Sequence, residues 1–376
     1  MTEMIRAHKI KLNPTPEQIG YFRQCAGIAR HCWNWSLAEY QKQVAAGEKP
    51  SFNEIKKAYR AAIDADFPFV RSVASCVIDE AVRDLSRSIS TFFKSRKTYL
   101  AAGNMKAVAR LKFPSWRKRR DDSGSFAYTN IAFSTDGNWL HLGRLAEPVN
   151  MTEAVRFPGK LMGCRVTQRA GEWFASITVE TEQPKPSAGT DIVGVHFGLR
   201  IAATISDGRQ IEPPRFLLRA EHRLTQLQRG LSKKVKGSAN WQKQKRKIGK
   251  AYLAVANQRA DFQHKLTTGL IQQSSAVAYD KWGVQELIDL PDQWWEKDFY
   301  DAGVATIAGM LDYKGSMYGV NVIAAKIKAS KICSTCGEVN ELLKLSQKKW
   351  GCPNCGAHHD REINAALNNR KHLEAI

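Results

Sequence analysis

Alternating apolar and polar side chains open the chain, and helical spacing follows them. Residues 4–12 alternate and predict a short strand. The segment Asn13-Pro14-Thr15-Pro16 ends this strand, because proline cannot donate a ladder hydrogen bond. Thr15 can cap a helix, with Gln18 three residues later. Apolar residues then recur at helical spacing: Ile19, Phe22, Cys25, Ala26 and Ala29.

Two more helices are predicted before the pattern changes. Ser51, followed by Glu54, can cap the first of them. The second is expected over about residues 70–97, with Val73, Val77, Ala81, Leu85, Ile89, Phe92 and Phe93 on one face. We therefore expect a helical block over about residues 13–100.

Strands are predicted from about residue 126 to residue 182. Residues 164–180 alternate on both sides of Ala170-Gly171, which predicts a hairpin. Strand, helical insert and further strands are the plan of a β-barrel interrupted by a helical lobe. The proline-containing segment 183–190 is the clearest linker.

The second half of the chain mixes strands and helices. Two apolar strands flank Gly198 within residues 192–211, and Asp207-Gly208 predicts the turn after them. The elements expected next are a long basic helical stretch (215–273), a buried strand (277–287), a helix (302–318), a strand (321–327) and a final helix from Asn364. This order predicts an RNase H-like α/β fold. The fold class is thus α+β and multidomain.

The charge of the chain points to a polyanionic partner. Among 376 residues, 57 Lys and Arg outnumber 36 Asp and Glu, giving a net charge of +21. Nucleic acid and an anionic membrane are the candidates. No window approaches the ~18 consecutive apolar residues of a spanning helix. The first residues lack the apolar core of a signal peptide, so we expect a cytoplasmic protein that binds nucleic acid.

Four of the eight cysteines form a metal-binding pattern. Cys333, Cys336, Cys352 and Cys355 make two Cys-x-x-Cys pairs, each followed by a glycine that permits a tight turn. This spacing predicts four thiolate ligands for structural zinc, whereas the reducing compartment argues against two disulfides. His358 and His359 lie nearby and are interpreted as exposed polar residues. The scattered Cys25, Cys32, Cys76 and Cys164 are expected to be reduced thiols, partly buried.

Two basic stretches are candidates for binding nucleic acid. In residues 111–120, cations that can neutralise phosphates surround aromatic side chains that can stack on bases: Lys112, Trp116, Arg117, Lys118, Arg119 and Arg120. A solvated loop explains this segment equally well. Residues 215–265 carry a longer run on two possible amphipathic helices, with Lys233, Lys234, Lys236, Lys243, Lys245, Arg246 and Lys247.

These features together resemble the TnpB family of transposon-encoded RNA-guided nucleases, relatives of the type V CRISPR effectors. The segments that carry the resemblance span the chain in order: 9–35, 166–180, 224–266, 310–322, the cysteine pairs and 360–368. The resemblance implies a wedge-like barrel (1–12 and 121–184) with a helical recognition lobe (13–120). It also implies a RuvC-like nuclease domain (190–330 and 356–376) holding a zinc ribbon (331–356).

The chain departs from the family at the three carboxylates that the nuclease centre uses. His196 takes the place of the first Asp in Gly194-Val195-His196-Phe197-Gly198. Gln285 takes the place of the second carboxylate, and Glu362 that of the third. Magnesium binds carboxylates, phosphates and water, so we expect it not to be bound here.

Neighbouring acids do not obviously substitute for the missing ones. Glu286 is one residue along a strand and should face away from Gln285. Asp191 lies five residues before His196, ~16 Å away in an extended strand. Asp360 is close to Glu362, and residual cleavage through either of them is left open.

Three functions remain open. The first is RNA-guided binding of double-stranded DNA beside a short flanking motif, without cleavage, which represses transcription by occupancy. The second is an active RNA-guided endonuclease with atypical ligands, and the third is an unguided DNA-binding protein or transposase accessory. On the first reading the partners are a guide RNA and the DNA target. The protein is then monomeric in a bacterial ribonucleoprotein at the nucleoid, and its cofactors are structural zinc and the guide.

Overall fold

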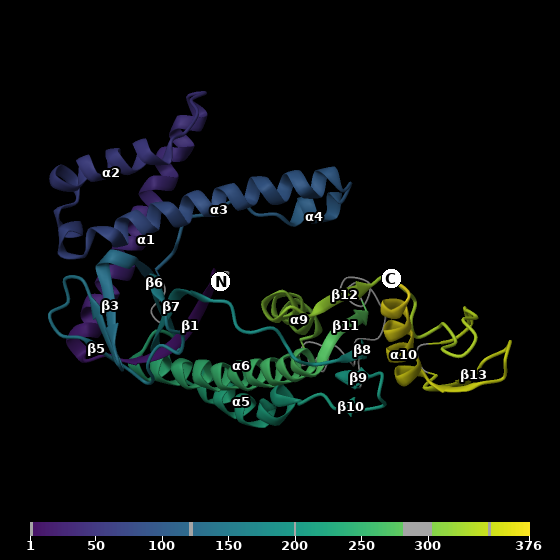
Figure 1. Cartoon of the computed structure of the whole chain (residues 1–376). Helices are drawn as coiled ribbons and strands as arrows, with labels where there is room; N and C mark the ends of the chain where they lie inside the picture. The colour runs from purple at the N-terminus through teal and green to yellow at the C-terminus, as the bar shows by residue number, and fades with distance from the viewer. Residues whose placement is uncertain (1–2, 120–122, 199–200, 281–302, 345–346) are drawn as a thin grey trace. The chain divides into compact units, whose positions relative to one another are not determined.

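The computed structural model describes residues 3–119, 123–198, 201–280, 303–344 and 347–376. It divides into two compact units, Met1–Glu182 and Gln183–Ile376, each with its own sheet and core (Figure 1). The division falls at the start of the predicted linker. In the described part of the chain, no helix is long and apolar enough to cross a membrane.

The N-terminal unit contains a nearly closed antiparallel sheet. Its strands run in the order β2-β6-β7-β1-β5-β4-β3. Their bounds are β1 Glu3–Asn13, β2 Ser125–Thr129, β3 Phe133–Asp136, β4 Trp139–Leu142, β5 Val149–Met151, β6 Lys160–Arg169 and β7 Glu172–Glu182. The two edge strands, β2 and β3, are joined by the single turn of 3₁₀ helix η2 (Asn130–Ala132). The two edges therefore approach each other, as the barrel prediction requires.

Five helical segments lie between β1 and β2: α1 Pro16–Ala45, α2 Phe52–Asp66, η1 Pro68–Ser72, α3 Ser75–Ala101 and α4 Met105–Arg110. Thr15 and Gln18 form the predicted capping box, and Ser51 caps α2. The prediction of a helix over residues 70–97 was wrong at its start. Pro68 initiates a 3₁₀ turn, and extended Val73 separates this turn from α3. Phe93, predicted to share a face with Val73 and Leu85, is 48 % exposed, whereas those two residues are buried.

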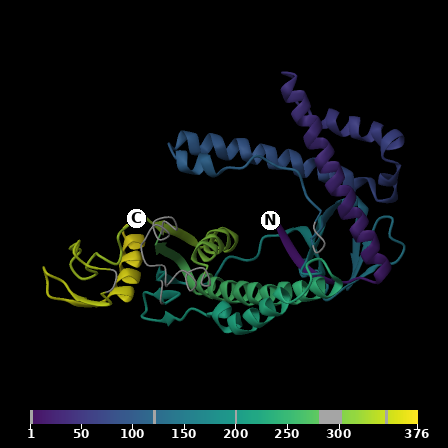
Figure 2. The same ribbon diagram turned by 180° about the vertical axis from the view of Figure 1, so that it is seen from behind.

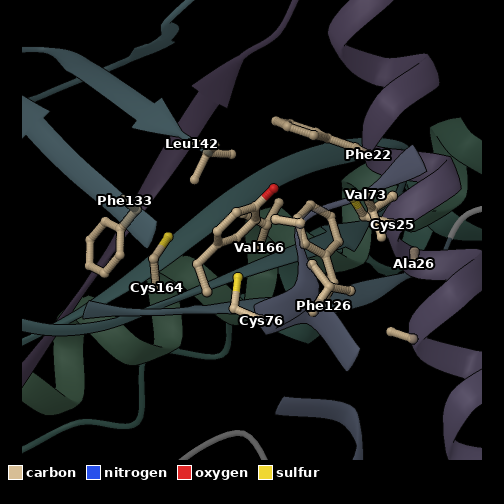
Figure 3. Packing of buried hydrophobic residues seen from close by; sticks show 14 of the residues in the cluster. Phe22, Cys25, Ala26, Val73, Cys76, Phe126, Phe133, Leu142, Cys164 and Val166 are labelled. Atoms are coloured by element: carbon tan, nitrogen blue, oxygen red, sulfur yellow. The ribbon is translucent and has the colours of Figure 1, made fainter. Parts of the chain in front are cut away.

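Aromatic packing joins this helical insert to the sheet. The ring of Phe22 on α1 lies 5.6 Å from that of Phe126 on β2 and 5.1 Å from that of Trp173 on β7. Figure 3 shows Phe22 and Phe126 with the thiols of Cys25, Cys76 and Cys164 in the same core. These thiols and Cys32 are buried and unpaired, so the expected free cysteines are confirmed.

The predicted hairpin is also confirmed. Strands β6 and β7 pair around Ala170 and Gly171, whose φ angles are +53° and +80°. Two successive positive φ angles are typical of a two-residue hairpin turn that matches the strand twist.

The C-terminal unit contains a mixed sheet in the order β10-β9-β8-β11-β12. Strand β8 (Asp191–His196) is parallel to β11 (Ser274–Asp280), which is parallel to β12 (Asn321–Ala325). The short strands β9 (Ala203–Ile205) and β10 (Gln210–Ile211) add antiparallel pairs. Because β8 and β11 are parallel neighbours, their carboxyl ends lie at the same edge of the sheet.

The helices that the structure describes in this unit are α5 Phe216–Ser232, α6 Ala239–Gln273, α9 Val304–Tyr318 and α10 Arg361–Glu374. The predicted basic stretch is two helices, which run alongside each other (Figures 1 and 2). Strand β11 begins at Ser274 rather than residue 277. Helix α10 begins at Arg361 rather than Asn364, because Asp360 accepts hydrogen bonds from the Glu362 and Ile363 amides and caps it.

Candidate functional site

Two glycines of the segment 194–198 let helix α10 approach strand β8. A Cβ atom on Gly194 would lie 2.0 Å from the carbonyl oxygen of Ala366 and 2.5 Å from the amide nitrogen of Arg370. A Cβ atom on Gly198 would lie 2.7 Å from Oε2 of Glu362. Position 194 therefore has to be glycine for α10 to pack on β8, whereas a side chain at position 198 would displace the carboxylate of Glu362.

His196 is clamped between two carboxylates at this edge of the sheet. Its Nδ1 hydrogen bonds to Oδ2 of Asp280, the last residue of β11. Its Nε2 lies 3.0 Å from Oε2 of Glu362 on α10. The side chain of His196 is 4 % exposed and that of Asp280 is 8 % exposed. The imidazole thus presents one nitrogen to each acid and fills the space between them.

Asn369 on α10 holds the same cluster from the side. Its Nδ2 donates to the carbonyl oxygen of Val195 at 2.9 Å and to Oδ1 of Asp280. Asp280 therefore accepts hydrogen bonds from both His196 and Asn369. Strands β8 and β11 and helix α10 therefore each contribute a side chain to one buried polar cluster.

The electrostatics of the cluster favour a charged histidine. Burial lowers the pKa of His196, but the charges and hydrogen bonds of Asp280 and Glu362 outweigh burial and raise the pKa to about 10. Burial raises the pKa of Glu362, whereas the hydrogen bond and charge of His196 lower it below its ordinary value. At neutral pH the cluster therefore holds an imidazolium cation between two carboxylates.

The structure brings together only part of the predicted centre. His196 and Glu362 meet as expected, whereas Gln285 and Glu286 lie outside the described residues. Asp280 was missed, because its place beside His196 depends on the parallel pairing of β11 with β8. Asp191 begins β8, at the end opposite His196, and Asp360 caps α10.

The four predicted cysteines converge. Their Sγ atoms all lie within 4.8 Å of one another. Cys333 Sγ is 3.7 Å from Cys355 Sγ, and Cys336 Sγ is 3.6 Å from Cys352 Sγ. A tetrahedral ion with ~2.3 Å metal–sulfur bonds needs sulfur atoms about 3.8 Å apart. In the described part of the chain this is the one group of His, Cys, Asp or Glu whose ligand atoms converge for a metal ion.

The two neighbouring histidines differ. His358 is exposed, as expected, whereas His359 is half-buried with Nε2 3.0 Å from Cys333 Sγ. Its ring packs on Trp350 at 4.8 Å. The interpretation of His359 as an exposed polar residue was therefore wrong. It is placed to hydrogen bond to a cysteine sulfur.

Helix α10 connects the four cysteines, called the cysteine group below, to the histidine cluster. The histidine cluster consists of His196, Asp280, Glu362 and Asn369. Asn364 Nδ2 donates to the carbonyl oxygen of Ile332 at 2.7 Å, and Asn364 Oδ1 accepts from the Ser334 amide at 2.8 Å. Asn368 donates to the carbonyls of Ala329 and Ile332. The helix that places Glu362 and Asn369 is thus anchored on its other side to the segment around Cys333.

The predicted basic residues occupy two surfaces. Trp116, Arg117 and Lys118 line a cavity of the N-terminal unit, with Lys112 and Arg119 exposed on the same loop. Arg120 lies outside the described residues. In the C-terminal unit the predicted cations follow the turn between α5 and α6 and the first turns of α6: Lys233, Lys234, Lys236, Lys243, Lys245, Arg246 and Lys247.

Comparison with known proteins places the chain in a family. Residues 176–290 match the OrfB_IS605 family model, described as "Probable transposase", and residues 305–369 match the "Cas12f1-like, TNB domain". Residues 1–49 match a "Helix-turn-helix domain" model of the same OrfB_IS605 group. A "Putative RNA-guided DNA endonuclease" of Streptomyces pristinaespiralis is 31 % identical, covering 98 % of this chain and 89 % of the relative.

A second relative and a solved structure agree with this match. "Putative RNA-guided DNA endonuclease InsQ" of Escherichia coli is 26 % identical, covering 97 % of this chain and 91 % of the relative. The Cas12f1 chain of a complex with sgRNA and target DNA shares the fold, with a TM-score of 0.57 at 13 % identity. That match covers 95 % of this chain and 83 % of the other. The chain shares its fold with Cas12f1, and the relative that is 31 % identical over nearly the whole chain shows its family. The chain belongs to the TnpB family.

Proposed function

We propose that this protein binds a guide RNA and, through it, a matching double-stranded DNA beside a short flanking motif, without cutting the DNA. Occupancy of a promoter would then repress transcription by blocking polymerase. Relatives over nearly the whole chain are named as RNA-guided DNA endonucleases. The net charge of +21 suits a protein that holds two nucleic acids by their backbones.

The position of His196 carries the part of the proposal that concerns cleavage. Two-metal hydrolysis needs a cluster of carboxylates that holds hard cations in line with the scissile phosphate. Here an imidazole lies between Asp280 and Glu362, with a hydrogen bond to Asp280 and its Nε2 3.0 Å from Oε2 of Glu362. With its pKa raised to about 10, the imidazole carries a positive charge at neutral pH, which would repel a divalent cation. The residues present do not fit magnesium.

Zinc fits the cysteine group. Cys333, Cys336, Cys352 and Cys355 would hold it as four thiolates, with sulfur separations close to those of a tetrahedral site. Four protein ligands leave no open position, so zinc supplies a structural crosslink there. His359 would hydrogen bond to the thiolate of Cys333 and fix its orientation.

The predicted domain roles complete the proposal. The barrel and helical insert of the N-terminal unit would form the wedge-like domain and recognition lobe. The mixed sheet of the C-terminal unit would be the RuvC-like domain, with the cysteine segment as its zinc ribbon. The cations of the α5–α6 turn, with Lys243, Lys245 and Lys247, would neutralise phosphates of the guide–target duplex.

An active endonuclease is the second candidate, and one observation favours it. Asp280 and Glu362 leave two carboxylates within reach of His196, more acids than the sequence pattern indicated. Two carboxylates and a neutral imidazole are a donor set that suits manganese or iron better than magnesium. This candidate requires that His196 lose its proton and turn away from one acid.

Sequencing of RNA that co-purifies with the protein from its own host tests guided binding. We expect one discrete species with a structured scaffold and a short variable end. A duplex that matches this end should then be bound, and a reporter promoter carrying it should be repressed. Random RNA fragments, with equal affinity for matched and scrambled duplexes, would reject guided binding.

A further inference from the structure

A cavity of about 770 Å³ opens in the N-terminal unit. It lies among α1, the loop after α4, and strands β2 and β6. The residues around it are mostly polar or cationic, with two tryptophans: Ala26, Arg30, Trp33, Ser115, Trp116, Arg117, Lys118, Ser123, Gly124, Ser125, Arg165, Thr167, Gln168 and Arg169. Its volume lies within the range of about 300–1,000 Å³ that small-ligand sites occupy.

The lining of this cavity is strongly cationic. The described residues that line it include five Lys and Arg side chains and no Asp or Glu. Arg165 is neutralised, since it makes two hydrogen bonds to Asp84 at 2.7 and 2.9 Å. Arg30, Lys118 and Arg169 have no carboxylate partner among the residues that the structure describes. An excess of positive charge among the described lining residues favours an anionic occupant.

The loop that carries Trp116 is fixed on both sides of it. Trp33 Nε1 donates to the carbonyl oxygen of Ser115 at 3.1 Å. The Asn34 amide pairs with the backbone of Arg117, through hydrogen bonds of 2.8 and 3.1 Å. The guanidinium of Arg117 lies 3.5 Å from the centre of the Trp33 ring. Trp116 is thus held at the cavity while 54 % of it stays exposed.

We propose that this cavity binds one unpaired nucleotide of a bound strand, an assignment that deepens the function proposed above and rests on it. The base stacks on the indole of Trp116, because every base has a π-face that an exposed aromatic side chain can cover. Arg30, Lys118 and Arg169 hold the flanking phosphates. Gln168, which is 7 % exposed and lines the cavity, offers an amide donor and acceptor to the base edge.

Binding of short fluorescein-labelled probes to the full-length protein tests the stacking. The probes are single-stranded RNA, single-stranded DNA of the same sequence, and the corresponding DNA duplex. Trp116→Ala is compared with Trp139→Ala, because Trp139 is 46 % exposed in the same unit and lies outside the cavity lining. We expect Trp116→Ala to weaken single-strand binding about tenfold or more, with Trp139→Ala close to wild type.

Two variants on helix α1 test the role of the cations. Arg30→Gln removes a lining charge, whereas Arg23→Gln removes an exposed charge on α1 that does not line the cavity. Both variants lose one positive charge, so general attraction to nucleic acid changes equally. We expect Arg30→Gln to weaken single-strand binding more and to reduce its salt dependence by about one phosphate contact.

The probes also separate the possible sources of the nucleotide. A loss confined to RNA assigns the cavity to the bound RNA, and a loss confined to single-stranded DNA assigns it to an unwound target strand. Both outcomes support the proposal. Equal affinities of Trp116→Ala and Trp139→Ala for every probe would overturn it, as would a loss confined to the duplex. Guided binding is scored independently by the co-purifying RNA, so either idea can fail while the other stands.

Discussion

The cysteine group and the histidine cluster lie on either side of helix α10, and they differ in what lies at their centre. The cysteine group keeps four like donors whose sulfur atoms converge on one point. In the histidine cluster the imidazole of His196 fills the point where Asp280 and Glu362 would otherwise meet. The sulfur separations in the cysteine group suit a tetrahedral metal ion, whereas the acids of the histidine cluster have an imidazole between them.

The contacts that hold α10 in the fold are distinct from the residues at which a nuclease of this family would bind its metal ions. Asn364 and Asn368 tie α10 to the cysteine segment, and Gly194 lets the same helix pack closely on β8. These contacts do not depend on a metal in the histidine cluster. A buried ion pair can replace the charge balance that a divalent cation would supply.

Breaking the cysteine group should have the largest effect. Cys352→Ser removes a buried ligand, and the free energy of zinc binding, on the order of 10 kcal/mol in small zinc domains, would be lost. We expect loss of bound zinc by elemental analysis and a lower melting temperature of the C-terminal unit. His358→Ala, at an exposed position beside the group, should keep both properties. Full zinc content in Cys352→Ser would exclude the four-thiolate site.

Removing one acid from the histidine cluster should rank next. Asp280→Ala leaves the imidazolium of His196 buried with one partner fewer, and such changes cost about 3–5 kcal/mol of the free energy of unfolding. The matched control is Glu374→Ala, which breaks an exposed ion pair with Arg370 on α10 and should cost at most about 0.5 kcal/mol. Chemical denaturation gives both values, and equal values would mean that the cluster is not an ion pair.

The raised pKa of His196 also predicts how the free energy of unfolding depends on pH. The pKa of His196 is raised from 6.5 to about 10 on folding, so its contribution is complete below about pH 6.5. It should then decline as pH rises toward 10. The difference in unfolding free energy between wild type and His196→Asn, measured from pH 6 to pH 10, should shrink along this range. A constant difference would indicate a neutral histidine.

Restoring a carboxylate should give the smallest effect on stability. His196→Asp places three acids together, and we expect magnesium to raise its free energy of unfolding by about 1–3 kcal/mol at ten to a hundred times the dissociation constant. Wild type should show no magnesium-dependent shift in melting temperature. His196→Asn, which adds no charge, is the control. A shift in the wild-type protein would show that the imidazolium does not exclude the ion.

Local signals in the sequence predicted much of the fold. The pair Thr15 and Gln18 marked the start of α1, and Ala170-Gly171 marked the hairpin turn, because each acts on neighbouring residues only. The four cysteines were predicted by spacing for the same reason. The start of α10 was misplaced because Asp360 was considered as a ligand, and its role as a helix cap was overlooked.

Features made by distant segments were harder to predict. Asp280 reaches His196 only because β11 pairs in parallel with β8, and no local pattern gives that register. The cavity of the N-terminal unit combines the predicted Trp116 with Arg30 from α1 and Arg169 from β6. Neither arginine belongs to a basic run. The predicted role of Gln285 remains a prediction, since it lies outside the described residues.

The most direct measurement is a cleavage assay on the ribonucleoprotein purified from its host. A duplex matching the co-purified guide is incubated with wild type and His196→Asp in magnesium and then in manganese, and binding is measured in parallel. We predict that wild type binds the matched duplex and leaves both strands intact with either metal. Metal-dependent cutting by wild type that Glu362→Ala abolishes would show that the protein is an active nuclease and not only a DNA-binding protein.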